Sequence, residues 1–128
     1  MEYFFSKIVP AEFADAITMT KKALAAEGFG IISEIDMQGK LKEKLGVDYK
    51  KYTILGACNP SYAYKALQIE EKVGTMLPCN VVVIDRGNGT TEIAAVHPVA
   101  SMMAIENAAL RSIAGKVTEK LEKAINQI

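Results

Sequence analysis

The chain has 128 residues, which is the length of one domain and enough to bury a single core. Half of the residues are hydrophobic and 23% are charged, as in ordinary soluble globular proteins. Fifteen basic residues balance fifteen acidic ones, which argues against a nucleic-acid-binding surface with its usual basic excess. No apolar run reaches the roughly 18 residues of a membrane span, and the first residues lack the pattern of a secretory signal. We therefore expect a cytoplasmic protein with no nucleic-acid and no membrane partner, in which two cysteines stay reduced.

The first third of the chain predicts two strands separated by a helix. Aromatic and β-branched residues favour the strands, and Phe13, Ile17 and Leu24 recur at helical spacing. Gly28 is suited to end the helix. The order fits either a βαβ crossover or a helix folded back over a sheet. The expected elements are a strand over 3–9, a helix over 11–27 and a strand over 29–35.

A short amphipathic helix and a third strand come next. Asp36 is a candidate N-cap for a helix around residues 39–45, and Gly46 closes that helix. Residues 52–58 predict the third strand. The strand runs directly into Asn59 and Pro60, which are typical of the N-cap and first turn of a helix. In that helix we expect Ala63, Ala66, Leu67 and Ile69 to face inward.

The most apolar segment, residues 79–84, predicts a central strand covered on at least part of both faces, because its apolar run is continuous. Residues 85–89 form a strong hairpin signal, and residues 90–97 the return strand. From about residue 99 to the C-terminus a single long helix is expected. Its apolar stripe consists of Leu110, Ile113, Val117, Leu121, Ala124 and Ile128. Together these elements predict a single α+β domain over residues 1–128, with a two-layer arrangement of helices on a mainly antiparallel sheet of about five strands.

The hairpin suggests where chemistry could reside. If Gly87, Asn88 and Gly89 form a three-residue loop, paired residue numbers sum to 176, and Cys79 lies across from His97 at roughly 5 Å between Cβ atoms. A two-residue loop of Asn88 and Gly89 shifts the pairing by one residue and still leaves the two side chains close. Cys58 ends the preceding strand, so an antiparallel arrangement brings it to the same edge of the sheet. The only histidine and the only two cysteines of the chain are then expected to converge.

Such a cluster has three interpretations. Cys58, Cys79 and His97 could bind a soft metal such as zinc, with a fourth position left for water, a ligand or a partner chain. Alternatively, Cys58 could be an activated thiol, because it precedes a helix N-terminus and has His97 as a possible base. In the third interpretation, the cysteines are small hydrophobic residues that only pack.

Two strings resemble one family of prokaryotic proteins, the domain of unknown function numbered 302. They are Leu55-Gly56-Ala57-Cys58-Asn59-Pro60 and Gly74-Thr75-Met76-Leu77-Pro78-Cys79-Asn80, each with a Cys-Asn pair beside a proline. The resemblance covers essentially the whole chain. It implies a compact α+β domain, a small cytosolic protein and a homodimer, with both cysteines in the family pattern and no established activity.

We therefore expect a small ligand-binding or metal-binding module. The candidate ligand-binding residues are Cys58, Asn59, Cys79 and Asn80, and the candidate metal ligands are Cys58, Cys79 and His97. A thiol-dependent enzyme or redox protein that uses Cys58 is the alternative. A structural homodimer with inert, buried cysteines is a further one.

Overall fold

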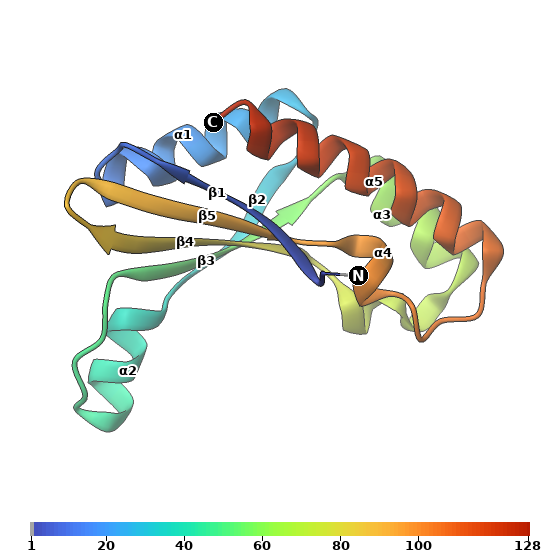
Figure 1. The fold of residues 1–128 in the computed structure, drawn as a ribbon. Helices are drawn as coiled ribbons and strands as arrows, with labels where there is room; N and C mark the ends of the chain where they lie inside the picture. Colours follow the sequence, from blue (N-terminus) through green and yellow to red (C-terminus); the bar gives the residue numbers. More distant parts are fainter. Residues whose placement is uncertain (1) are drawn as a thin grey trace.

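The structure is a computed structural model that describes residues 2–128. One layer is a five-stranded sheet in which every pair of neighbouring strands is antiparallel (Figure 1). The strands lie in the order β1-β5-β4-β3-β2, so β4 is central. The strands are β1 (Phe4–Val9), β2 (Gly30–Asp36), β3 (Tyr52–Cys58), β4 (Cys79–Gly87) and β5 (Thr90–Val96). This confirms the predicted α+β class and the antiparallel sheet.

Three helices, α1 (Phe13–Ala26), α3 (Pro60–Ile69) and α5 (Ala108–Asn126), form the second layer on one face of the sheet (Figure 1). Helix α1 joins β1 to β2, which are the two edge strands, so it crosses over the sheet instead of linking neighbouring parallel strands. Four antiparallel pairings separate β1 from β2, so these two strands run parallel to each other. Of the two arrangements that the sequence left open, the structure therefore has the βαβ crossover, with three strands between its two strands. The helical elements are α1 (Phe13–Ala26), α2 (Met37–Leu45), α3 (Pro60–Ile69), the 3-10 helix η1 (Glu71–Met76), α4 (Pro98–Ser101) and α5 (Ala108–Asn126).

The β4–β5 hairpin has the predicted register. Every pair from Val81↔Ala95 to Asp85↔Thr91 has residue numbers that sum to 176. The turn is tight because Gly87, Asn88 and Gly89 all adopt positive φ, at 77°, 55° and 73°. A bulge after Asp85 then pairs Gly87 with Thr90.

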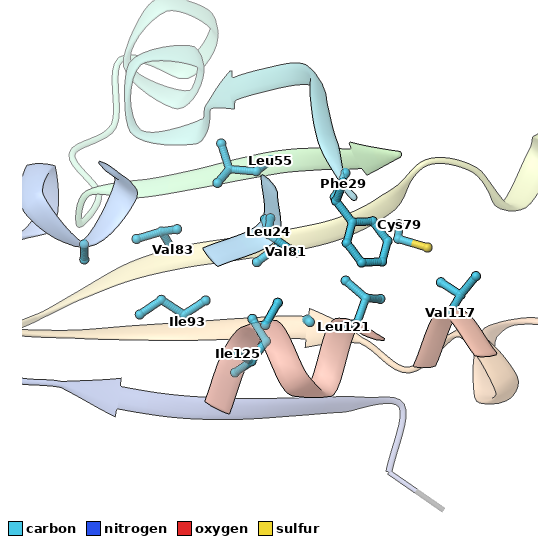
Figure 2. Close-up of a cluster of buried hydrophobic side chains, with 14 of the residues drawn as sticks. Leu24, Phe29, Leu55, Cys79, Val81, Val83, Ile93, Val117, Leu121 and Ile125 are labelled. Atoms are coloured by element: carbon cyan, nitrogen blue, oxygen red, sulfur yellow. The ribbon is translucent and has the colours of Figure 1, made fainter. Parts of the chain in front are cut away.

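One face of the sheet is covered by helices and the other is open. On the inner strands, successive side chains alternate between these two faces. On β4, Val81 and Val83 are fully buried under the helices, whereas Val82 and Ile84 are only half-buried on the other side. The expected central position of β4 is confirmed. Of the expected cover on at least part of both faces, the structure shows full burial on one face and half-burial on the other. The helices contribute apolar stripes to the covered face, and Leu24 of α1 and Leu121 of α5 are fully buried there (Figure 2).

The C-terminal part differs from the single helix that was predicted. Helix α4 ends at Ser101, and α5 begins only at Ala108. The break has a local cause, because the side chain of Asn107 accepts a hydrogen bond from the backbone N–H of Leu110 and starts a new helix. The predicted stripe on α5 is present, with Leu110, Val117, Leu121 and Ala124 buried.

Candidate functional site

Cys58 and Cys79 meet at one end of the sheet, where β3 ends and β4 begins. Ala57 pairs directly with Cys79 across the two strands, so Cys58 follows the partner of Cys79 by one residue. Both cysteines are free thiols, Cys79 buried and Cys58 half-buried. The predicted convergence of the two cysteines is therefore present.

His97 follows β5 at the same end of the sheet as the cysteines, but it contacts strand β1 instead of β4. The pairing of β4 with β5 stops at Val81 and Ala95, whereas the next residue of β5, Val96, still pairs with β1. The His97 backbone N–H continues that pairing and donates to the carbonyl of Tyr3 at 2.8 Å. Its ring packs edge-on against Phe5, with 6.0 Å between the ring centroids, and its buried Nδ1 has no hydrogen-bond partner within residues 2–128. Because β5 follows β1 away from β4, the extrapolated pairing of Cys79 with His97 is not formed.

The predicted metal set is consequently not assembled. Within residues 2–128, no three His, Cys, Asp or Glu side chains come together in a way that could hold a metal ion. Two thiols alone leave half of the tetrahedral shell of zinc unfilled. The residues present do not fit a zinc site.

A pocket lies between the ends of β3 and β4 and the helices α3 and α5, and both cysteines line it. It lies at the seam between two hydrophobic clusters: the main core, which includes Phe29, Cys79 and Val117, and a second cluster, which includes Ala66 and Met102. Figure 2 shows Cys79 beside Phe29, at the end of the β4 row formed with Val81 and Val83. The pocket is lined by Phe29, Ala57, Cys58, Asn59, Tyr62, Ala63, Ala66, Leu77, Pro78, Cys79, Pro98, Met102, Leu110, Ile113, Ala114 and Val117.

The pocket is small and apolar. Its cavity holds about 40 Å³, compared with the roughly 10–15 Å³ that one water needs. Four of the lining residues are alanines from three different elements: Ala57, Ala63, Ala66 and Ala114. Larger side chains at these positions would fill the space, so the cavity follows directly from their small size.

The polar side chains of the pocket gather among its half-buried residues, which are Cys58, Asn59 and Tyr62. Asn59 occupies the N-cap position of α3 but makes no capping hydrogen bond with its side chain. Instead its amide donates to the carbonyl of Glu27 at 3.3 Å, which ties the start of α3 to the end of α1. The capping role expected for Asn59 is therefore wrong, although Pro60 does stand at the first turn as predicted.

Burial sets the chemistry of Cys79. Desolvation, with a smaller contribution from the neighbouring Cys58, raises its pKa from 9.0 to about 11. A thiol with such a pKa is protonated at neutral pH, which makes Cys79 a weak nucleophile and a neutral part of the wall. His97 is not in the wall of the pocket, so it does not supply a base there.

Asn80 lies on the other side of the sheet. Side chains alternate along β4, and Asn80, which pairs with Gly56, is exposed on the open face while Cys79 is buried. Asn80 therefore does not line the pocket that Cys79 lines, and its role in ligand binding stays a prediction. The likeness of the two strings does not extend to their geometry.

The comparisons with known proteins agree with this architecture. Residues 5–128 match the family described as domain of unknown function DUF302. The chain belongs to the DUF302 family. A solved structure, the uncharacterized conserved DUF302 protein from Bacillus stearothermophilus, is similar at a TM-score of 0.91 and 30% identity. The similarity covers 99% of this chain and 98% of that one. No curated protein matches the chain.

Sequence reasoning missed much of the wall of this DUF302 pocket. Tyr62, Ala63 and Ala66 were detectable in part, because the helix start at Pro60 fixes which residues of α3 share a face. Met102 was assigned to a continuous helix, and Phe29 to an ordinary strand. Leu67 and Ile69, expected to face inward, are 43% and 39% exposed. No helix of residues 2–128 has both the length and the apolar character to cross a membrane.

Proposed function

We propose that this DUF302 domain is a binding module for a small, largely apolar molecule that occupies the pocket between Cys58 and Cys79. The observation that carries the proposal is the open seam between two otherwise closed hydrophobic clusters. Protein interiors normally close such seams, because each unfilled volume forfeits dispersion contacts. An apolar cavity of this kind stays dry and accepts apolar guests.

The wall also indicates the chemical class of the ligand. Nearly all of the lining is hydrocarbon or thiol, so the buried part of the ligand is apolar and uncharged. Almost none of the pocket surface is polar, so the wall supplies no orienting hydrogen bonds and favours a ligand without polar groups. The proposal includes a cytoplasmic location, because the two thiols are part of the wall only while they are reduced.

The test uses xenon and methane as probes of the full chain, because both are small enough for a cavity of about 40 Å³. We expect saturable amide shifts in nuclear magnetic resonance spectra, confined to pocket residues such as Ala57, Cys79 and Val117. Each probe should also slow the alkylation of half-buried Cys58 by iodoacetamide.

Two matched variants decide the result. Ala66→Leu fills the cavity from α3 and should abolish the saturable shifts, and Ala63→Leu does so from the preceding turn should the first variant fold poorly. Ala25→Leu adds the same side chain at an exposed position of α1 and should leave binding unchanged. Non-saturable shifts in the wild type, or binding that survives both filling variants, would overturn the proposal.

A further inference from the structure

The open face of the sheet carries an apolar surface that no other element of residues 2–128 covers. Cross-strand pairing fixes its composition, since directly paired residues share a face: Ile54 pairs with Val82, Val82 with Ala94, and Phe4 with Val96. Six apolar residues form its centre, all of them half-buried: Phe4, Ile54, Val82, Ile84, Ala94 and Val96. Contiguous apolar surface of this kind marks an interaction site.

A second unpartnered element lies on the same side of the molecule. We name residues 37–51, which comprise α2 and the segment that leads into β3, the arm. Figure 1 shows α2 projecting on the side of the sheet opposite to α1 and α5. The arm is braced internally, because Lys42 pairs with Asp48 at 2.9 Å and Gln38 donates to the carbonyl of Tyr49 at 2.9 Å.

The arm nevertheless has no fully buried residue within residues 2–128. Helix α2 has no buried residue, and Leu45, Val47 and Tyr49 are 69%, 44% and 45% exposed. A helix of nine residues is marginal in water without tertiary contacts. An ordered but unburied arm beside an uncovered apolar sheet indicates that both contact another surface.

We propose that the open face and the arm form the interface of a two-fold symmetric homodimer, in which each arm packs against strand β1 of the other copy. The two sheets stack face to face, with the two-fold axis along the strand direction. That axis places the β2 edge of one copy over the β1 edge of the other. Because the axis runs along the strands, the hairpin end of one sheet lies over the hairpin end of the other.

The strand ends meet correctly in this arrangement. The arm leaves the sheet where β2 ends at Asp36 and β3 begins at Tyr52, which is the end near the β4–β5 hairpin. Ile8 lies at the same end of β1, paired with Glu92, and is 60% exposed. The symmetry therefore brings the exposed Leu45 of one copy to the exposed Ile8 of the other.

Charge and area both suit a second copy. The charged side chains on this face, Arg86 and Glu92, already form an ion pair with each other, so stacking two copies brings no net charge together. Five strands at about 4.8 Å, each with about six residues of about 3.3 Å, give a footprint of roughly 24 Å by 20 Å. Two such faces bury on the order of 1,000 Å², the lower bound for a specific interface, and the arms add to this area.

The first test is the mass of the full chain in solution, by sedimentation at micromolar concentration. We expect twice the 13.9 kDa of one chain. Val82→Glu puts a charge at the centre of the open face and should halve the mass, with little change in the circular dichroism spectrum. Tyr64→Glu places the same charge on the exposed outer side of α3 and should leave the dimer intact. A monomeric wild type, or a dimer that survives Val82→Glu, overturns the proposal.

The second test examines the arm. Within one chain, Ile8 lies on the edge strand β1, whereas the arm that carries Leu45 leaves the sheet from β2 and β3 at the opposite edge, too far away for an internal disulfide. In a Cys58→Ser, Cys79→Ser background, the double variant Ile8→Cys, Leu45→Cys should give a covalent dimer on mild oxidation. The pair Ile8→Cys, Tyr64→Cys should not. A dimer that forms without this cross-link would show that the arm does not reach the partner, and would reject the arrangement.

Discussion

The two faces of the sheet are built from adjacent residues with opposite environments. Leu55 is fully buried beneath the helices, whereas its neighbour Ile54 is half-buried on the open face. The same contrast holds on β4 between Val81 and Val82. Both residues of each pair are apolar, so composition alone does not tell the covered face from the open one. What differs is the presence of a second layer in the same chain.

The largest expected effect comes from the two single truncations at Leu55 and Ile54, compared with each other. Leu55→Ala should lower the free energy of unfolding by about 2–5 kcal/mol, because it removes packed methyl groups and leaves a cavity. Ile54→Ala should cost about 1 kcal/mol or less in a monomer, since half-exposed side chains lose less burial. Urea denaturation at low protein concentration measures both values.

Protein concentration sharpens this comparison. If the open face is covered by a second copy, the cost of Ile54→Ala should grow as the wild type is measured at higher concentration, whereas the cost of Leu55→Ala should not. Equal costs for the two variants at low concentration would contradict the assignment of the two faces.

The two cysteines of the pocket also differ in burial. Cys79 is 8% exposed and has a pKa raised to about 11, whereas Cys58 is half-buried. The neutral thiol is the form that the folded protein favours at Cys79. Its contribution to stability is therefore complete below pH 9 and is lost as the pH rises from about 9 to about 11.

Over that range we expect the free energy of unfolding to fall by about 2–3 kcal/mol because of Cys79, since each pKa unit corresponds to about 1.4 kcal/mol. Titration of Tyr52, whose pKa burial also raises, adds to the loss in the same direction. The measurement is therefore the difference between the wild type and Cys79→Val, by urea denaturation at several pH values. Parallel curves for the two proteins would show that Cys79 is not desolvated.

Most of the fold was predictable because its signals are local. The hairpin register followed from Gly87-Asn88-Gly89, and the short helix α2 followed from Asp36 and Gly46. The C-terminal break was not predicted because apolar spacing continues across it, and the cap at Asn107 was outweighed by that pattern. The cover on each face of β4 is a tertiary property, and a continuous run of valines does not encode it.

The candidate site was predictable only in part, for a related reason. The prediction that Cys58 and Cys79 lie close together is confirmed, because β3 and β4 stay paired up to Ala57 and Cys79. The same reasoning failed for His97, because β5 leaves β4 after Ala95 and continues with β1. The point at which two strands diverge depends on tertiary packing. The pocket is built from residues of several distant elements, so neither feature has a local sequence signal.

The smallest expected effects distinguish two asparagines that occupy the same position before a helix. Asn107 accepts a hydrogen bond from the backbone N–H of Leu110 at 3.1 Å, whereas Asn59 donates one to the carbonyl of Glu27 at 3.3 Å. Asn107→Ala should therefore cost about 1 kcal/mol of unfolding free energy as a lost cap. Asn59→Ala should cost about 0.5–1.5 kcal/mol as one ordinary hydrogen bond.

Aspartate at each position should separate the two roles by sign. Asn107→Asp keeps the acceptor and adds a favourable charge at the start of α5, so stability should equal or exceed that of the wild type. Asn59→Asp turns the donor into a carboxylate that faces the Glu27 carbonyl oxygen. At neutral pH it should be less stable than Asn59→Ala. A carboxylate that faces a carbonyl oxygen has no donor for either acceptor, whereas alanine places no second acceptor there. Thermal unfolding of the four variants measures the order, and a stabilising Asn59→Asp would show that Asn59 caps α3 after all.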